Sequence, residues 1–286
     1  MGVALITPFK IDESIDYDAL ARLVEYLIKN GTDYLVVCGT TAETPTLTEL
    51  EKEELTRFVV ECVAGRLPIV LGLGGNNTKA VVEKLHTTDF NGIDAILSVT
   101  PYYNKPSQEG LYQHFTAIAN ASPLPIVLYN VPGRTGVNML AETTLRLAKE
   151  FSNICAIKEA SGNFTQIDDI IKNKPEEFMV ISGDDAITFP LITLGAVGVI
   201  SVIGNAFPRE FSRMVRLALQ GDYKSSRQIH HRFTELIQLI FAEGNPAGVK
   251  SMLAVMGFIE NKLRLPLVPN TIKTYEKIRL VLNQLV

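Results

Sequence analysis

The sequence predicts an α/β protein, a (β/α)8 barrel with a C-terminal helical extension, on three observations. Eight short apolar runs alternate with amphipathic segments along most of the 286 residues. The runs are continuously apolar, as is typical of parallel strands covered on both faces. A single barrel can occupy about 250 residues, so the length does not require two domains. An open doubly wound sheet is the main rival, because the pattern alone cannot show that the sheet closes.

The predicted strands are short runs bounded by turn-forming residues. They are Val3–Thr7, Tyr34–Cys38, Pro68–Leu73, Ala95–Val99, Ile126–Tyr129, Ile154–Lys158, Met179–Ser182 and Gly198–Val202. The carboxyl ends of the strands of a barrel meet at one rim, so we expect the chemistry among the residues that end or follow these runs.

Amphipathic segments with a helical period follow the strands. They are Asp18–Asn30, Thr48–Ala64, Lys79–Phe90, Gln108–Ala119, Leu140–Phe151, Phe164–Lys172, Ala186–Leu194 and Pro208–Leu219. The second begins with Thr48-Glu49-Leu50-Glu51, which has the spacing of a capping box. Its expected apolar stripe consists of Leu50, Leu55, Phe58, Val59 and Cys62.

The strand signal stops after Gly221, and the remaining chain is helical by its period. Helices are predicted over Tyr223–Ala242, Pro246–Phe258 and Thr271–Val286. This tail is too polar on one face to form a core of its own. We therefore divide the chain into a barrel, residues 1–221, and a helical extension packed on it, residues 222–286.

The composition of the chain argues against several classes of function. Apolar residues make up 47% of the chain and charged residues 20%, which suits a globular protein with a large core. The net charge of −4 and the absence of a basic run argue against a nucleic-acid partner, and no apolar stretch is long enough to span a membrane. Cys38, Cys62 and Cys155 show no metal-ligand spacing and predict reduced thiols of a cytoplasmic protein. No H-E-x-x-H, C-x-x-C or carboxylate cluster indicates a metal.

Lys158 ends a buried strand, at the position where an α/β barrel carries its chemistry. An ordinary lysine has a pKa near about 10.4, so only about one in 2,500 is a free amine at pH 7. Burial can lower a lysine pKa by a few units, and the free amine is a nucleophile that forms an imine with a carbonyl. The other interpretation is a structural lysine paired with a carboxylate such as Glu159, and this stretch alone favours it.

Hydroxyl groups follow two other strands. Thr40 and Thr41 lie beside main-chain N–H groups, which suits the binding of a carboxylate, or they cap the strand end. Tyr129 could offer a phenol to a reacting group, or it packs in the core. Gly183-Asp184-Asp185 follows the seventh strand.

Three more polar residues lie at the expected rim. Tyr102 and Tyr103 could relay a proton, or they pack at the rim or at an interface. Arg134 lies between two glycines of a loop, which suits recognition of a carboxylate or phosphate, or it forms a surface salt bridge. The histidines have no motif partner, and solvent or packing roles are expected for His86, His114, His230 and His231.

Four sequence motifs follow one another along the chain, each at the end of a predicted strand. They are G-T-T-A-E-T-P-T-L at Gly39–Leu47, T-P-Y-Y-N-K-P at Thr100–Pro106, Y-N-V-P-G-R-T-G at Tyr129–Gly136 and I-K-E-A-S-G at Ile157–Gly162, and they continue in G-D-D at Gly183–Asp185 and G-V-I-S at Gly198–Ser201. In this order and spacing the chain resembles the dihydrodipicolinate synthase family over essentially its whole length. The resemblance implies a barrel with a C-terminal helical extension, usually a homotetramer. It also implies a lyase that condenses pyruvate with L-aspartate 4-semialdehyde to 4-hydroxy-tetrahydrodipicolinate, in diaminopimelate and lysine biosynthesis.

The resemblance also implies catalytic roles. Lys158 forms the imine, or Schiff base, with pyruvate. Tyr129, Thr41 and Tyr103 form a proton relay, in which Tyr103 reaches in from a neighbouring subunit. No metal or organic cofactor is implied, because the lysine supplies the electrophile, and a monovalent cation near the interface is left open.

The implied substrate-binding residues are Thr40, Thr41, Arg134, Ile200 and Gly183. The two threonines hold the pyruvate carboxylate, and the carbonyl of Ile200 lines the same pocket. Arg134 binds the carboxylate of the aldehyde substrate near the entrance.

The chain departs from the family pattern at two places. The family usually reads G-T-T-G-E where this chain has Ala42, and if that position needs a positive φ the alanine costs about 1 kcal/mol. The family's lysine-feedback pocket usually contains histidines where this chain has Glu49 and Lys52. We therefore expect weak or no inhibition by lysine.

Two other functions stay open. N-acetylneuraminate lyases and keto-deoxy-sugar-acid aldolases share the lysine, the tyrosine and the G-[ST]-T-G-E loop, but they do not usually keep the arginine found at Arg134. A catalytically inactive barrel that binds a keto acid or a partner protein is the second alternative. The joint presence of Lys158, Tyr129, Tyr103 and Thr41 argues against it.

Overall fold

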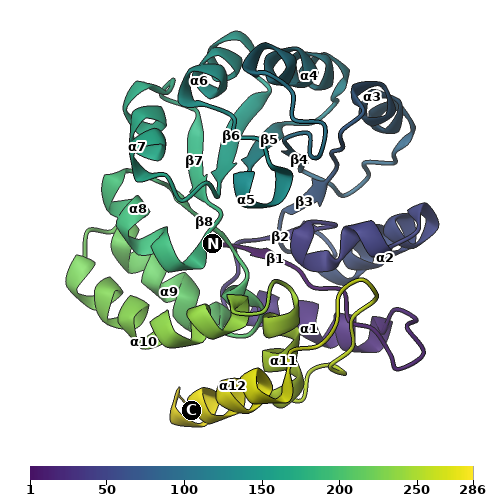
Figure 1. The fold of residues 1–286 in the computed structure, drawn as a ribbon, viewed down its shortest axis with the longest axis vertical. Coiled ribbons are helices and arrows are strands. Elements are labelled where there is room, and N and C mark those ends of the chain that lie inside the picture. The colour runs from purple at the N-terminus through teal and green to yellow at the C-terminus, as the bar shows by residue number, and fades with distance from the viewer. Residues whose placement is uncertain (286) are drawn as a thin grey trace. The chain divides into compact units, whose positions relative to one another are not determined.

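The computed structural model describes residues 1–285, and its eight parallel strands are hydrogen-bonded in sequence order into a closed barrel (Figure 1). This strand order confirms the predicted barrel and excludes the open doubly wound sheet. The predicted strands are all present, with small shifts at their ends. They are β1 Gly2–Ala4, β2 Tyr34–Val37, β3 Ile69–Gly72, β4 Ala95–Val99, β5 Ile126–Asn130, β6 Ile154–Glu159, β7 Met179–Ser182 and β8 Gly198–Ser201.

Apart from α5, the helices occupy the predicted segments. They are α1 Tyr17–Lys29, α2 Glu49–Val63, α3 Thr78–Thr87, α4 Gln108–Ala121, α5 Pro132–Thr135, α6 Ala141–Glu150, α7 Phe164–Asn173, α8 Thr188–Leu194, α9 Pro208–Leu219, α10 Tyr223–Phe241, α11 Ala247–Val255 and α12 Ile272–Leu285. Val286, the last residue of the predicted final helix, lies outside the described residues. Sequence analysis missed α5 and the 3₁₀ turns at Thr40–Ala42 and Thr44–Thr46, because segments this short show no period.

The capping box at the start of α2 is confirmed. The Thr48 hydroxyl accepts a hydrogen bond from the N–H of Glu51 (3.2 Å), and the Glu51 carboxylate accepts one from the N–H of Thr48 (2.8 Å). The assignment of Leu50 to the buried stripe was wrong, because its side chain lies in the first turn and is 63% exposed. The buried face of α2 consists instead of Leu55, Val59 and Val63, which recur every four residues.

The chain forms two compact units, and each is described by itself. The first comprises residues 1–68 together with the chain from Ser201 onward, and the second comprises residues 69–200. In the first unit α10 contacts α9, α11 and α12. In the second unit α3, α4, α6 and α7 pack on one another in series outside the strands (Figure 1). The division at residue 221 stays a prediction. Within residues 1–285 no helix is both long and apolar enough to cross a membrane.

The strand register of the second unit sorts side chains onto two faces of the sheet. Tyr129 pairs with Lys158, and the next residues along, Asn130 and Glu159, also pair. Successive side chains of a strand point to opposite faces. Because Asn130 and Glu159 hydrogen-bond to each other and Glu159 accepts a hydrogen bond from Gln166 of α7, their row faces the helices. Tyr129 and Lys158 therefore project from the face turned away from the helices.

His114 of α4 makes the stability of the second unit sensitive to acid. Its buried ring contacts Phe115 and its Nδ1 lies 2.9 Å from the hydroxyl of Thr78, and burial lowers its pKa from 6.5 to about 4. The unfolded chain binds a proton near pH 6.5 and the folded chain only near pH 4. The free energy of unfolding should therefore fall by about 3 kcal/mol as the pH drops through this window.

Urea unfolding between pH 7 and pH 4 measures this effect. We expect a His114→Gln variant to lose about 3 kcal/mol of the pH dependence, because the titrating ring is gone. His86→Gln, at an exposed position of α3, should keep the wild-type dependence. Equal pH dependence in both variants would contradict the assignment to His114.

Candidate active site

Lys158 and Tyr129 lie side by side on β6 and β5. Both side chains are buried, and Nζ of Lys158 lies 4.3 Å from the centroid of the Tyr129 ring. The structure contradicts the alternative of a Lys158–Glu159 pair, because the two side chains face opposite sides of β6. The Glu159 carboxylate instead accepts hydrogen bonds from the N–H of Ser161 (2.7 Å) and from Asn130 (3.1 and 3.2 Å). Lys158 is thus a buried amine beside a phenol, which suits imine chemistry.

A buried polar network lies behind this pair, on the helix side of the sheet. Nδ2 of Asn130 donates to the Glu159 carboxylate and to Oδ1 of Asn138 (2.8 Å). Nε2 of Gln166 donates to Oε2 of Glu159 (3.3 Å), and Asn138 donates back to Oε1 of Gln166 (2.8 Å). Burial raises the pKa of the Glu159 carboxyl, and these donors act in the opposite direction. The network holds the residues directly after Tyr129 and Lys158, and sequence analysis missed it because amide side chains form no recognisable motif.

Gly183, predicted to bind substrate, lies against Lys158. Its N–H donates to the carbonyl oxygen of Glu159 (2.8 Å). A Cβ atom at this position would lie 2.8 Å from Cβ of Ala160 and 3.2 Å from Cε of Lys158, so only glycine fits without a shift. Ile200, the other predicted residue of this unit's later strands, is buried in β8.

Tyr103 lies in a loop that is hydrogen-bonded to the short helix that carries Arg134. The N–H of Tyr103 donates to the carbonyl oxygen of Thr135 (3.3 Å), and Thr135 belongs to the short helix α5 that carries Arg134. Both predicted side chains are exposed, and that of Tyr103 is 89% exposed. Tyr103 also has a φ of 73°, which is uncommon for a bulky residue. An outward-directed, strained aromatic residue is a candidate for contact with another molecule.

Thr40 and Thr41 belong to the first unit, in the 3₁₀ turn after β2. Thr41 is buried, and its hydroxyl accepts a hydrogen bond from Nδ2 of Asn245 (3.0 Å). The expected cost of Ala42 does not arise, because Ala42 has no positive φ. The left-handed residue of this turn is Glu43, with a φ of 56°.

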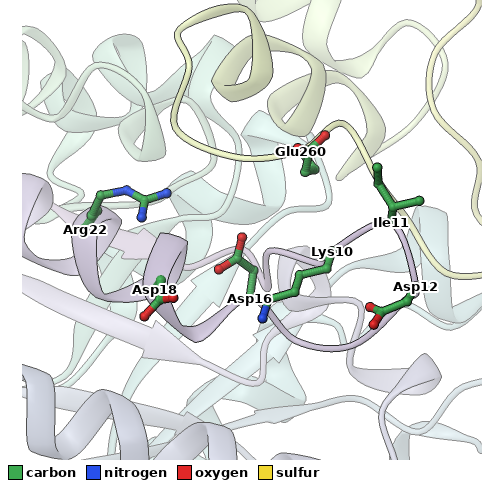
Figure 2. A pocket seen from close by; sticks show the side chains of 7 residues that line it. All are labelled: Lys10, Ile11, Asp12, Asp16, Asp18, Arg22 and Glu260. Carbon is green, nitrogen blue, oxygen red and sulfur yellow. The ribbon is translucent and has the colours of Figure 1, made fainter.

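The first unit also has a surface pocket that contains no predicted site residue (Figure 2). It is lined by Lys10, Ile11, Asp12, Asp16, Asp18, Arg22 and Glu260. Two of its carboxylates already serve local structure, because Asp12 accepts hydrogen bonds from Ser14 and Asp16 caps α1. Within residues 1–285 no group of three or more His, Cys, Asp or Glu side chains is placed to hold a metal ion. The candidate active site is therefore the region around Lys158.

Comparison with known proteins gives one consistent result. A model of the dihydrodipicolinate synthetase family matches residues 1–285. The 4-hydroxy-tetrahydrodipicolinate synthase of Parabacteroides distasonis is 76% identical over 285 residues, which cover 100% of this chain and 96% of that protein. The crystal structure of dihydrodipicolinate synthase from Aquifex aeolicus superposes with a TM-score of 0.95 at 44% identity, covering 99% of this chain and 96% of that one. The enzyme from Cyanidioschyzon merolae, solved with lysine bound, gives a TM-score of 0.95 at 41% identity, with coverage of 99% and 97%.

Proposed function

Because the chain belongs to the dihydrodipicolinate synthetase family, we propose that it is a lyase that condenses pyruvate with L-aspartate 4-semialdehyde. The product is 4-hydroxy-tetrahydrodipicolinate, on the route to diaminopimelate and lysine. The structural observation that carries the proposal is the buried amine of Lys158 beside the ring of Tyr129. A carbonyl substrate that reaches this amine can form an imine in a site shielded from bulk water.

The proposed reaction begins when Nζ of Lys158 attacks the carbonyl carbon of pyruvate and water leaves. The protonated imine withdraws electrons, so the pyruvate methyl group loses a proton and becomes a carbon nucleophile. This carbon attacks the aldehyde carbon of the second substrate, whose oxygen takes up a proton and becomes a hydroxyl group. The amino group of that substrate then attacks the imine carbon, closes the ring and releases Lys158 as a free amine.

Proton transfers accompany each of these steps, and we assign them to Tyr129, Thr41 and Tyr103. Tyr129 is supported by its position beside Lys158. We assign the pyruvate carboxylate to Thr40 and Thr41, and we also assign Gly183 and Ile200 to substrate binding. Arg134 receives the carboxylate of the aldehyde substrate, which its fork of N–H donors suits.

Two assays separate this function from the alternatives. The purified protein should form the cyclic product from pyruvate and aspartate semialdehyde, as followed by a coupled assay, and should release no pyruvate from sialic acid. Pyruvate release from sialic acid without synthase activity would favour a sugar-acid lyase. Absence of both activities would favour a binding protein.

We further propose that the enzyme needs no metal or organic cofactor, because the protonated imine itself supplies the electrophile. A monovalent cation remains compatible with this chemistry.

A homotetramer built as a dimer of dimers is proposed as the working form, located in the cytoplasm. The exposure and the positive φ of Tyr103 support a subunit interface at this residue. An aromatic side chain that lies in solvent contributes little stabilisation to offset the strain of its own backbone. Cys62 and Cys155 are free thiols, which suits a reducing compartment.

Feedback by lysine should be weak. At the start of α2, Lys52 donates a 2.7 Å hydrogen bond to Glu49, so the two residues that replace the usual histidines pair with each other. We expect the initial rate at saturating L-lysine to stay close to the rate without it. D-lysine at the same concentration controls for ionic strength. Loss of most of the activity with the L-isomer alone would show that a feedback site is retained.

A further inference from the structure

The turn that carries Thr40 and Thr41 ends in a strained residue. Glu43 has a φ of 56° and a ψ of 34°, a left-handed conformation that residues other than glycine rarely adopt. Such a conformation persists only where the surroundings hold it in place. Part of that support comes from the segment after β1, because the hydroxyl of Thr7 donates to the carbonyl oxygen of Ala42 (2.8 Å). The rest comes from the C-terminal segment.

Lys250 of α11 forms an ion pair with the carboxylate of Glu43, and neither side chain is exposed to solvent. The second carboxylate oxygen accepts a hydrogen bond from the N–H of Arg264 (3.1 Å). Nζ of Lys250 also donates to the carbonyl oxygen of Lys262 (3.0 Å). A buried charge is costly unless it is paired and hydrogen-bonded, so each of these groups requires the others. The pair therefore ties α11 to the end of the Thr40–Glu43 turn.

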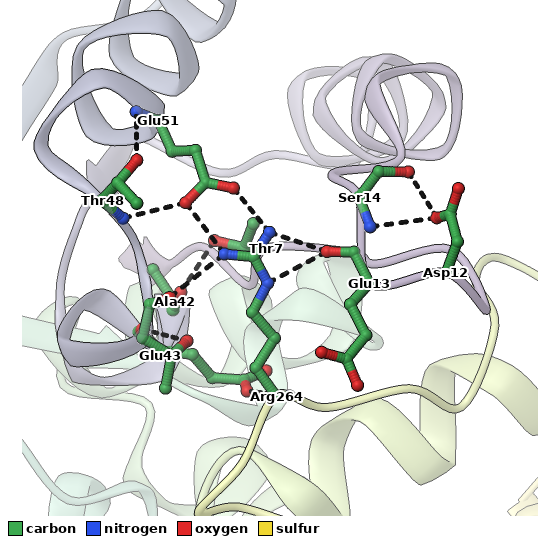
Figure 3. A network of polar contacts seen from close by, with 10 residues as sticks. Thr7, Asp12, Glu13, Ser14, Ala42, Glu43, Thr48, Glu51 and Arg264 are labelled. Carbon is green, nitrogen blue, oxygen red and sulfur yellow. Dashed lines mark hydrogen bonds and ion pairs between the residues drawn. The ribbon is translucent and has the colours of Figure 1, made fainter.

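The Arg264 side chain joins the next 3₁₀ turn, Thr44–Thr46, to α2 (Figure 3). Its guanidinium donates to the carbonyl oxygen of Thr46 (3.1 Å), to the Glu51 carboxylate (2.9 Å) and to the carbonyl oxygen of Glu13 (2.7 Å). This guanidinium is the main cause that lowers the pKa of Glu51 to about 2. Glu51 also closes the capping box of α2. The N–H of Arg264 thus holds Glu43 at the end of the Thr40–Glu43 turn, and its side chain holds the segment that leads from this turn into α2.

Asn245 sets the direction of the Thr41 hydroxyl group. The amide nitrogen of Asn245 can only donate, so the Thr41 oxygen must accept this hydrogen bond. The hydroxyl hydrogen is then free to donate elsewhere, as the binding of an anionic carboxylate requires. An acceptor in place of the amide nitrogen would capture this hydrogen.

We propose that Asn245, Lys250 and Arg264 are positioning residues for pyruvate, which act by holding the Thr40–Glu43 turn and by aiming the Thr41 hydroxyl at the pyruvate carboxylate. The inference rests on the proposed role of Thr40 and Thr41 in the synthase reaction. It gives the C-terminal segment a part in substrate binding as well as in stability.

The test compares Asn245→Ala and Asn245→Asp with the wild-type enzyme. Loss of one hydrogen bond predicts an increase of about 5–10-fold in KM for pyruvate in Asn245→Ala. Asn245→Asp should raise this KM further, because an ionised carboxylate accepts the Thr41 hydrogen and repels the anionic substrate. KM for aspartate semialdehyde should stay within about 2-fold in both variants. The concentration dependence of borohydride trapping with pyruvate alone should show the same weakening.

Asn153→Asp is the matched control, because Asn153 also donates a partly buried hydrogen bond, to the carbonyl oxygen of Ala119 (2.8 Å), in a part of the chain with no proposed substrate role. It should lower the melting temperature with no change in KM for pyruvate. Arg264→Gln, which leaves the Lys250–Glu43 pair intact, replaces the Asn245 variants if they do not fold and should also raise KM for pyruvate selectively.

An unchanged KM for pyruvate, or equal increases in both KM values, would overturn the positioning role while leaving the synthase function standing. A wild-type enzyme without synthase activity would instead overturn the proposed function, and the positioning role with it.

Discussion

Replacing Lys158 by methionine should abolish turnover, with a loss on the order of 10⁶-fold, as found when a covalent nucleophile is removed from a well-studied enzyme. Methionine fills most of the volume of the lysine side chain but cannot form an imine, so the covalent route disappears while the packing around β6 is largely kept. The measurement is kcat in the coupled assay with pyruvate and aspartate semialdehyde. Borohydride trapping of pyruvate should disappear together with turnover.

Lys79→Met is the matched control for this prediction. Lys79 is a lysine of α3 whose side chain is 85% exposed, and it forms a surface ion pair with Glu83 at 3.7 Å. Such a pair contributes little to stability, so this variant should keep wild-type kcat and trapping. Retention of more than about 1% of the activity by Lys158→Met would be incompatible with the covalent route.

The Tyr129→Phe variant should lower kcat by about 10²–10⁴-fold, the usual contribution of general acid–base catalysis. The variant keeps the aromatic ring beside Nζ of Lys158 and removes only the hydroxyl, so the effect reports on proton transfer. The rate of trapping with pyruvate should fall with kcat, because imine formation itself requires proton transfers. The measurement is kcat and the trapping rate across pH 6–9.

Tyr112→Phe provides the control for Tyr129→Phe. The Tyr112 hydroxyl donates to the carboxylate of Glu150, so this variant also removes a hydrogen-bonded phenol, from helix α4. We expect a modest loss of stability and no change in kcat. If Tyr129→Phe changes kcat no more than Tyr112→Phe does, the Tyr129 hydroxyl takes no part in the reaction.

Most of the fold could be predicted because its signals are local. Continuous apolar runs mark strands covered on both faces, and the capping box of Thr48 and Glu51 marks the start of a helix within one residue. Closure of the barrel could not be read from the pattern, because it depends on pairing between residues far apart in the chain. The short helix α5 and the 3₁₀ turns at Thr40–Ala42 and Thr44–Thr46 were missed because they are too short to show a helical period.

Some residues of the candidate site could be predicted from the sequence and others could not, again because only local patterns are visible in a sequence. Lys158, Tyr129 and Gly183 end or follow strands, and the structure of the second unit brings them together. The residues that support them, such as Glu159 and Asn130, have no motif because any polar group of suitable size can satisfy a buried network. One signal was present in the tail, since Lys250 is the single charged residue of the apolar helix α11 and a buried lysine requires a partner.

The two buried lysines among residues 1–285 allow a direct measurement of the central claim, that Lys158 is the amine that captures pyruvate. Burial lowers the pKa of Lys250 to about 8, which makes this residue the alternative amine for the capture of pyruvate. Its side chain, however, is fully buried and forms an ion pair with Glu43. The measurement is borohydride reduction in the presence of pyruvate, followed by peptide mapping by mass spectrometry. We expect a single pyruvate-derived adduct on the peptide that contains Lys158. An adduct on Lys250, or an unmodified protein that still makes the product, would contradict the account.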